Sequence, residues 1–389
     1  MKSVMHQRLV VGLASVFLGG VTGSVIAEEE AAKPARHTLS TLNGEIVAER
    51  VLSGLSEPGA IEFLPDGKAL LMQRDLGVMT LVDFGTGEKT NIEGMPDMLV
   101  FSSAGAHDIE LHPQYAENGW IYLSYSEGEE FHSTVVLDRV KLDGTRVTER
   151  ERVFTADAYG ETAYHYGARI QFDEGYVFMT IGDRQHPERA QEVDNHAGTI
   201  VRLHDDGRVP DDNPFIGQKK DGRTEFRPEI WSYGHRNPQG FYRHPETGEL
   251  WSDEHGPRGG DELNRVKKGA NYGWPVISYG LQYNGGPIGM GIPYKEGMEI
   301  PVWTYVPSIA PSDLVIYEGD AFPAWKGDFF IGALAGMHLN RLVLRDGEVI
   351  AEERIGKPLL GRIRCLAVDA DGLIYLGNDD GEVWRLSPQ

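Results

Sequence analysis

The stretch Asp369-Ala370-Asp371-Gly372-Leu373-Ile374-Tyr375-Leu376 places a turn sequence directly before a short apolar strand sequence. Asp and Gly favour tight turns, whereas β-branched and aromatic residues favour strands. The same order of turn and strand recurs five times upstream, at residues 64–72, 112–123, 173–179, 244–251 and 322–331. This repetition predicts six similar units of about 50–60 residues each.

Several units continue into a further strand that contains a basic-aliphatic pair, as at Arg202-Leu203, Arg341-Leu342 and Arg385-Leu386. The sequence has no convincing amphipathic helix of three turns or more. Repeated turn–strand units of this kind are typical of propeller blades. We therefore expect an all-β fold, a six-bladed β-propeller of four-stranded antiparallel blades, over residues 46–389. An array of β-sandwiches is the alternative, but the units share one marker, as repeats do.

The N-terminus has the pattern of a secretory signal peptide. Lys2 and Arg8 precede an apolar run over residues 9–27, and the small-residue site Val25-Ile26-Ala27 is followed at once by acidic residues. This pattern predicts a signal peptide over residues 1–27, cleaved near Ala27, and a periplasmic or secreted protein. An uncleaved anchor helix is the alternative. Residues 28–45 are polar and Ala/Glu-rich, which predicts a flexible lead-in.

Composition excludes several classes of protein. The formal net charge of −22 disfavours binding to nucleic acid and to anionic membranes. Cys365 is the only cysteine, so no intrachain disulfide can form. The chain has no phosphate-binding P-loop, no dinucleotide fingerprint, no paired-cysteine metal motif and no serine nucleophile elbow. No apolar run after the signal peptide is long enough to span a membrane.

Four segments carry residues suited to chemistry. His165 lies in a Gly-containing loop and could act as a general base, or it could be a loop residue without a role. Arg236 and Asn237 bring two hydrogen-bond donors into a tight Gly/Pro turn, which could equally be structural. The acidic, Gly-rich segment 253–262 offers oxygen ligands for a hard cation, or forms a solvated turn.

The fourth segment is Arg362-Ile363-Arg364. On a strand, its two arginines face the same side, so they could hold an anion with several carboxylates, or face solvent. The long connections 183–197 and 275–300 are candidate walls of a site, because ligand sites of propellers usually lie at the mouth of the channel.

At these four segments the sequence resembles the soluble PQQ-dependent glucose and aldose sugar dehydrogenases, and the aldose sugar dehydrogenase branch more than the other. The resemblance covers roughly residues 48–388. Its most specific blocks are Tyr-Gly-His-Arg-Asn-Pro-Gln-Gly (233–240), Glu-His-Gly-Pro-Arg-Gly-Gly-Asp-Glu (254–262) and Asn-Tyr-Gly-Trp-Pro (271–275). The stretches 180–184, 307–312 and 332–336 support them. The resemblance independently implies a six-bladed propeller.

The resemblance also implies roles for individual residues. His165 matches the catalytic base that removes the proton of the anomeric hydroxyl while the C1 hydride passes to PQQ. Arg236 and Asn237 match the pair that contacts the quinone oxygen. The carbonyls of Gly256 and Pro257 match ligands of a Ca²⁺ ion that also holds the cofactor. Arg362 and Arg364 match contacts to the cofactor carboxylates.

Two positions depart from the glucose dehydrogenase pattern. Ala335 stands where a Lys would contact PQQ, and Ser103 stands where a Gln near the active site is usual. Loss of a cation would weaken PQQ binding by about 1–3 kcal/mol. Arg184 or Arg258 are candidates to compensate for it.

These observations lead us to expect a periplasmic oxidoreductase that converts aldose sugars to aldonolactones with PQQ and Ca²⁺, and passes electrons to an external acceptor. Two alternatives remain at this stage. One is a metal-dependent sugar lactonase, which would need a ring of carboxylate and Asn ligands at the channel. The other is a non-catalytic propeller binding module that has lost PQQ.

Overall fold

The computed structural model describes residues 35–389, which consist almost entirely of β-strands. Their one α-helix is the short α1 (Tyr115–Asn118), and their three 3₁₀ turns are η1 (Arg74–Leu76), η2 (Pro187–Gln191) and η3 (Pro323–Trp325). The predicted signal peptide and the first part of the lead-in lie outside the described residues. Among residues 35–389, no helix combines the length and the apolar character needed to cross a membrane.

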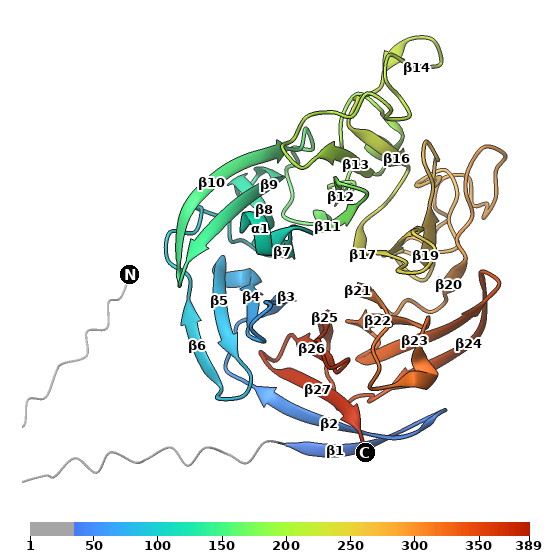
Figure 1. The fold of residues 1–389 in the computed structure, drawn as a ribbon. Helices are drawn as coiled ribbons and strands as arrows, with labels where there is room; N and C mark the ends of the chain where they lie inside the picture. Colours follow the sequence, from blue (N-terminus) through green and yellow to red (C-terminus); the bar gives the residue numbers. More distant parts are fainter. Residues whose placement is uncertain (1–34) are drawn as a thin grey trace, which may run out of the picture. The chain divides into compact units, whose positions relative to one another are not determined.

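Six antiparallel sheets follow one another around a common axis, as predicted from the repeats (Figure 1). Blade 1 contains β3 (Pro58–Phe63), β4 (Ala69–Gln73), β5 (Val78–Asp83) and β6 (Glu88–Asn91). Blade 2 contains β7 (Ala106–Leu111), β8 (Ile121–Glu129), β9 (His132–Asp143) and β10 (Arg146–Thr155). Blade 3 contains β11 (Gly167–Asp173), β12 (Tyr176–Ile181), β13 (Thr199–His204) and β16 (Ile230–Tyr233).

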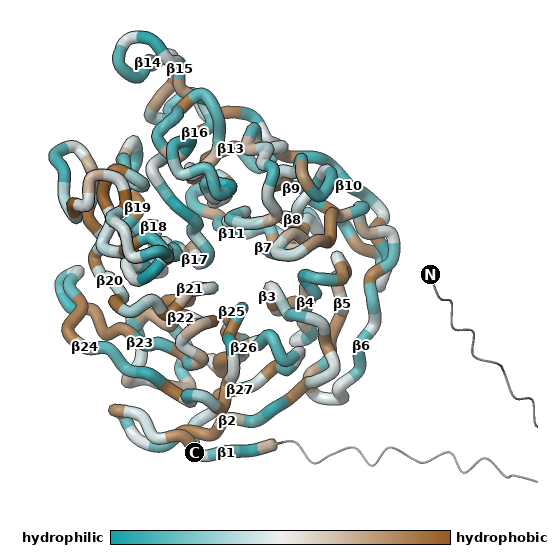
Figure 2. The backbone as a smooth tube through the Cα atoms, turned by 180° about the vertical axis from the view of Figure 1, so that it is seen from behind, coloured by the Kyte–Doolittle hydropathy of each residue, from teal (hydrophilic) through white to brown (hydrophobic). Residues whose placement is uncertain are grey.

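Blade 4 contains β17 (Pro238–Arg243), β18 (Leu250–Glu254), β19 (Asp261–Val266) and β20 (Trp303–Tyr305). Blade 5 contains β21 (Pro311–Ile316), β22 (Phe329–Ala333), β23 (His338–Arg345) and β24 (Glu348–Ile355). Blade 6 contains β25 (Ile363–Val368), β26 (Ile374–Asn378) and β27 (Val383–Pro388). A small hairpin, β14 (Lys219–Lys220) with β15 (Thr224–Glu225), projects from blade 3, and it is largely hydrophilic (Figure 2).

The repeated marker stretches of the sequence occupy equivalent positions in the ring. Each of them forms the second strand of its blade, namely β4, β8, β12, β18, β22 and β26. The three basic-aliphatic pairs lie in third strands, on β13, β23 and β27. The prediction of six four-stranded antiparallel blades is therefore confirmed.

The ring closes by pairing the two ends of the described chain. Strand β2 (Gly44–Leu52) supplies the outer strand of blade 6 and pairs antiparallel with β27, with Ala48 opposite Leu386 (Figure 1). Strand β1 (Arg36–Thr41) adds a fifth strand beyond β2. Residues 36–45 of the expected lead-in therefore include strand. Their polar side chains are mostly exposed, so the backbone ladder to β2 orders them without an apolar signal in the sequence.

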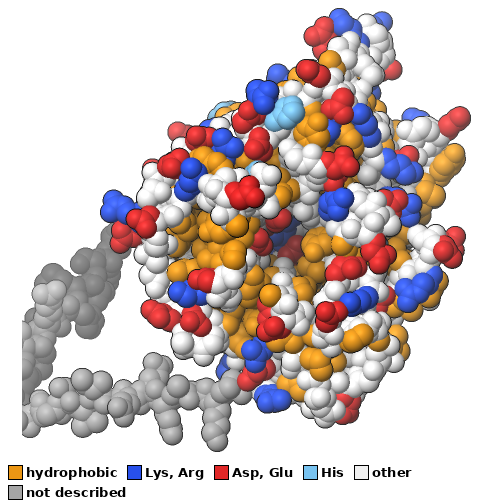
Figure 3. Space-filling view, in the orientation of Figure 1, with side chains coloured by type: hydrophobic (Ala, Val, Ile, Leu, Met, Phe, Trp, Pro, Cys, Tyr) orange, Lys and Arg blue, Asp and Glu red, His pale blue; other side chains and the backbone are white. Residues whose placement is uncertain are grey.

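Apolar layers between neighbouring blades hold the ring together. In one of them, Tyr122 and Leu137 of blade 2 lie in the same buried cluster as Ile170 and Met179 of blade 3. Equivalent clusters lie around the rest of the ring, which buries both faces of the inner blade strands. The outer surface mixes acidic and basic side chains, and it is hollowed at the centre of the ring (Figure 3).

All six innermost strands bulge at the same level of the channel. The pairing of each first strand with the second strand of its blade shifts by one residue there. A bulge leaves residues without a partner and redirects their side chains. Six residues at these bulges line one cavity on the axis, and we call them the axial residues: Gly59, His107, Arg169, Gln239, Ser312 and Arg364.

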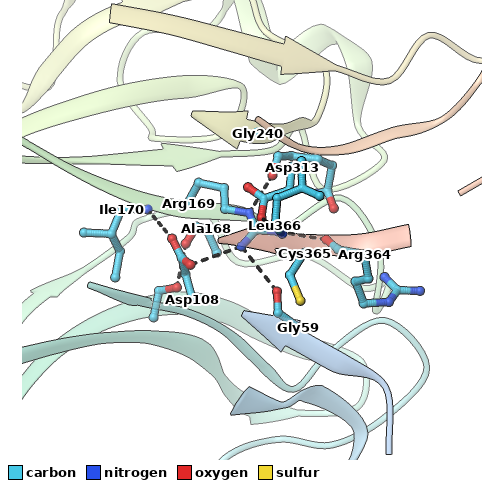
Figure 4. A network of polar contacts seen from close by, with 12 residues as sticks. Gly59, Asp108, Ala168, Arg169, Ile170, Gly240, Asp313, Arg364, Cys365 and Leu366 are labelled. Carbon is cyan, nitrogen blue, oxygen red and sulfur yellow. Dashed lines mark hydrogen bonds and ion pairs between the residues drawn. The ribbon is translucent and has the colours of Figure 1, made fainter. Parts of the chain in front are cut away.

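Arg169 joins the other five blades at the axis (Figure 4). A guanidinium group has five N–H donors. Here each blade other than blade 3 provides one acceptor within hydrogen-bond distance: the carbonyls of Gly59, Gln239, Ser312 and Arg364, at 3.3, 2.6, 2.9 and 3.2 Å, and Oδ1 of Asp108 at 3.1 Å. Burial alone would lower the pKa of Arg169, but the carboxylates of Asp313 and Asp108 outweigh it and raise this pKa.

Replacement of this group tests its structural role. We expect Arg169→Met to lower the free energy of unfolding by about 3–5 kcal/mol, because it leaves a buried carboxylate and four carbonyls without their donor. Denaturant unfolding, followed by tryptophan fluorescence, measures the loss. Arg208→Met is the control, since Arg208 pairs with Asp206 on the surface and should leave the unfolding midpoint unchanged. A loss below about 1 kcal/mol for Arg169→Met would contradict the assignment.

Candidate functional site

A cavity of about 540 Å³ occupies the axis on one side of Arg169. The axial residues form its floor, and loops that enter and leave the blades form its walls. Of the seven residues predicted from the sequence, four line this cavity: His165, Asn237, Arg362 and Arg364. A second, outer cavity of about 700 Å³ adjoins it, because His165, Gln185 and Tyr283 line both. Arg236 and Pro257 line the outer cavity.

His165 is held in a strained loop before β11. Its φ of 54° lies in the left-handed region. Gly182 permits this loop to pass close by, because a Cβ atom at that position would lie 2.1 Å from the carbonyl oxygen of His165. Arg184 stabilises the loop by donating to the carbonyls of Tyr164 and of Thr162, the latter at 2.8 Å. The loop therefore presents the imidazole to the cavity in a fixed position.

Asp183 sets the tautomer of His165. Its Oδ1 lies 2.6 Å from Nδ1 of His165. Burial would raise the pKa of Asp183, but the hydrogen bond from His165 and the charges of His165 and Arg236 lower it. Burial lowers the pKa of His165, and the hydrogen bond and charge of Asp183 offset this lowering only in part. An ionised carboxylate can only accept, so Nδ1 carries the proton and Nε2 keeps its lone pair for a substrate proton.

The sequence analysis did not identify Asp183 as a functional residue. It lies in the stretch 180–184 that supported the family resemblance, but its distance from His165 along the chain hides their contact. The loop that follows β12 brings the two together. The connection 183–197, which was predicted to be a wall of the site, does supply Gln185 and Pro187 to the cavities. The connection 275–300 supplies residues of the outer cavity, including Gln282, Asn284 and Ile288.

Arg236 and Asn237 directly precede β17, and both are almost fully buried, at 7% and 5% exposure. Arg236 donates from Nη1 to the carbonyl of His255 at 3.0 Å, and its backbone N–H donates to Glu254 at 2.6 Å. The Oδ1 atom of Asn237 accepts from the backbone N–H of Gly167 at 3.2 Å. These contacts fix both side chains beside His165, where their remaining donors can stabilise a developing negative charge.

Arg362 directly precedes β25 and Arg364 lies at its bulge, and both line the axial cavity. Both donate through Nε to the carboxylate of Asp379, at 2.8 and 2.6 Å, which leaves their terminal nitrogens for other partners. Besides Arg169 on the floor, Arg74 at the start of η1 is a further cation in this cavity and was not predicted. It pairs with Glu57, and its pKa falls to about 10 because of burial and the nearby charge of Arg364. This wall is therefore suited to an anion with several carboxylates.

The structure also locates the positions that depart from the glucose dehydrogenase pattern. Ser103 lines the axial cavity, whereas Ala335 is exposed and its neighbour Leu334 lines the cavity. Neither Arg184 nor Arg258 lines it, so neither is placed to supply a cation to this cavity. Arg184 is fully buried and bonds to backbone carbonyls, and Arg258 is exposed. Arg74 is the additional cation that the axial cavity contains.

Gly256 and Pro257 form a tight turn after β18. A Cβ atom at Gly256 would lie 2.3 Å from the carbonyl oxygen of Gly259, so only glycine fits there. The turn is fixed by Asp261, whose Oδ1 accepts from the backbone N–H of Gly256 at 2.8 Å. Among residues 35–389, no hydrogen bond ends on the carbonyl of Gly256 or Pro257. Both oxygens are thus available to a hard cation.

The described residues also include no cluster of three or more His, Cys, Asp or Glu side chains placed to hold a metal.

Comparison with known proteins identifies the family of the chain. The chain matches the glucose/sorbosone dehydrogenase family over residues 55–385. It is 37% identical to the aldose sugar dehydrogenase YliI of Escherichia coli, over 90% of this chain and 94% of that one. It is also 34% identical to the uncharacterised protein slr1608 of Synechocystis, over 88% of this chain and 86% of that one.

Solved structures show the same fold. The apo form of the soluble aldose sugar dehydrogenase of Escherichia coli superposes with a TM-score of 0.83 at 36% identity, covering 88% of this chain and all of that one. The PQQ-bound form of the aldose sugar dehydrogenase of Streptomyces coelicolor superposes with a TM-score of 0.73 at 25% identity, covering 92% and 99% of the two chains. The resemblance seen in the sequence is confirmed, and the chain is an oxidoreductase that belongs to the glucose/sorbosone dehydrogenase family.

Proposed function

We propose that this protein oxidises aldose sugars at C1 to aldonolactones, with PQQ as the hydride acceptor bound in the axial cavity. The observation that carries the proposal is the position of the His165–Asp183 pair at the junction of two cavities. One cavity has the cationic wall of Arg74, Arg362 and Arg364. The other combines an apolar wall, which includes Trp274, with polar side chains such as Gln282 and Asn284. This combination is suited to binding a sugar.

The residues present fit PQQ. The cofactor carries three carboxylates, and besides Arg169 on its floor the axial cavity contains three arginines whose charges are only partly neutralised by Glu57 and Asp379. Within residues 35–389, the buried Nε atom of Arg74 has no hydrogen-bond partner. Arg236 and Asn237, close to His165, would contact the quinone oxygen. When bound, PQQ supplies an electrophilic quinone that accepts a hydride.

The chain's own residues have separate tasks in this proposal. His165 receives the proton of the anomeric hydroxyl at Nε2. Asp183 keeps the proton at Nδ1 and stabilises the imidazolium that forms. Arg236 and Asn237 donate to the oxygen on which negative charge develops. Arg362 and Arg364, with Asp379 between them, orient the anionic cofactor from the opposite wall.

We further propose that the carbonyls of Gly256 and Pro257 bind Ca²⁺. Hard cations prefer oxygen ligands, and this turn offers two carbonyls beside Arg236. The cation would offset the charge of the cofactor in a chain whose formal net charge is −22.

The proposal includes a location and a partner. We place the mature chain, residues 28–389, in the periplasm or outside the cell after cleavage of residues 1–27, with residues 46–389 as the catalytic domain. Electrons leave to an external acceptor, because a reduced quinone must be reoxidised before the next turnover.

Neither alternative has a specific observation in its favour. A lactonase would need a carboxylate cluster, and residues 35–389 contain no such metal-binding group. A binding module that has lost PQQ was suggested by Ala335 and Ser103. That suggestion did not take Arg74 into account, which supplies a cation to the axial cavity.

Reconstitution tests the function. With Ca²⁺ and PQQ, the purified chain should reduce an electron-acceptor dye when aldoses are added. His165→Ala should lower kcat by at least about 10²-fold while changing the PQQ dissociation constant by less than about threefold. His132→Ala, at an exposed histidine outside both cavities, is the control and should leave kcat unaltered. Dye reduction by His165→Ala at the wild-type rate would remove this residue as the base.

The pH dependence tests the His165–Asp183 pair. Because burial lowers the pKa of His165, kcat/KM should be constant above about pH 6.5 and fall as the pH drops through this lowered pKa. Asp183→Asn removes the charge that opposes the lowering, so the acid limb should move to still lower pH. The loss of tautomer control should also reduce kcat by about 10²–10⁴-fold. An acid limb that does not move would contradict the pairing.

A further inference from the structure

The carboxylate of Asp183 is shared between three donors, one of which is the backbone N–H of Gln185, which donates to Oδ1 at 2.8 Å. Oδ1 faces Nδ1 of His165 at 2.6 Å, and Oδ2 accepts from the indole N–H of Trp274 at 2.8 Å. Asp183 is also anchored through its backbone, whose N–H donates to the carbonyl of Arg236 at 2.8 Å. Both carboxylate oxygens therefore have specific partners at a side chain that is only 1% exposed.

Trp274 is itself held rigidly, although it belongs to the long connection between β19 and β20. Its backbone N–H donates to the carbonyl of Gly234 at 2.9 Å, and its own carbonyl accepts from Nε2 of Gln191 at 2.9 Å. The indole ring lines the outer cavity, and the guanidinium carbon of Arg236 lies 5.3 Å from its centroid. One side chain thus contacts both the partner of His165 and the arginine beside it.

We propose that Trp274 is a positioning residue for His165: its indole N–H fixes the orientation of the Asp183 carboxylate and takes up part of its charge. The proposal rests on the proposed function, in which His165 is the base. Without the indole donor, more of the charge of Asp183 would act on the imidazole, although the backbone N–H of Gln185 would still donate to Oδ1. With it, the carboxylate still orients His165 but stabilises the imidazolium less.

Several charged or titratable groups surround His165. Asp183 and Arg184 come from the loop after β12, Arg236 from the turn before β17, and His255 from the end of β18. Both arginines oppose protonation of His165, and Asp183 alone favours it. The pKa of His165 therefore depends on how strongly the charge of Asp183 acts on the imidazole.

Trp274→Phe tests the proposal, because it keeps an aromatic ring and removes only the donor and part of the ring system. In protein without cofactor, labelled at histidine, NMR titration should show the pKa of His165 rising by roughly 0.5–1 unit. The resonance is assigned by its absence in His165→Ala. In reconstituted enzyme, the acid limb of kcat/KM should rise by the same amount, and kcat should fall about threefold to tenfold.

Trp303→Phe is the matched control. Trp303 is also partly buried, but its indole N–H has no hydrogen-bond partner among residues 35–389. It should leave the pKa of His165 unchanged. If Trp274→Phe does not fold, benzothienylalanine at position 274, an isostere that lacks the N–H, replaces it in the same titration.

A His165 pKa in Trp274→Phe that stays at the wild-type value, or falls, would overturn the proposal. The titration needs no cofactor and no turnover. Failure of the proposed function would instead appear as absence of sugar oxidation by the wild-type chain, so the two failures are distinguishable.

Discussion

The ring depends on one buried guanidinium group. Arg169 directs its five N–H donors to acceptors in the five other blades, four of which are backbone carbonyls at the bulges. Packing between the sheets holds each blade only against its two neighbours. Arg169 is the residue within 35–389 that we find bonded to every other blade at once, so it fixes the distance of all six inner strands from the axis. A buried arginine requires compensating charge, which Asp108 and Asp313 provide.

The bulges that direct carbonyls toward Arg169 also shape the candidate site. A carbonyl that turns toward Arg169 belongs to a residue that has left the regular ladder, and such residues line the cavity above it. Gln239 and Arg364 illustrate this, because the backbone of each binds Arg169 while its side chain lines the axial cavity. The bulges hold the strands in place and direct polar side chains inward. Loops from the mouth of the ring then add His165, Asn237 and Arg362.

Patterns among neighbouring residues predicted the features that depend on short stretches of sequence. The turn-then-strand markers found the second strand of every blade, and the two closely spaced arginines Arg362 and Arg364 line the same cavity. Long-range contacts were not predictable in this way. Arg169 follows His165 by four residues without any sign in the sequence that it lies on the axis. Neither Asp183 nor Arg74 has a spacing that connects it to the site. Residues 36–45 looked like a flexible lead-in because β1 carries polar side chains, while backbone pairing with β2 orders them. The predicted signal peptide lies outside the described residues and stays a prediction.

A crystal structure of the chain with PQQ and Ca²⁺ tests the central claim most directly. Our account predicts electron density for the cofactor in the axial cavity, with carboxylates at Arg362 and Arg364, the quinone oxygen at Arg236 and Asn237, and a cation at the carbonyls of Gly256 and Pro257. His165 should lie beside the quinone with Nε2 facing the outer cavity. Density for PQQ elsewhere on the protein, or an empty axial cavity at saturating PQQ, would contradict the account.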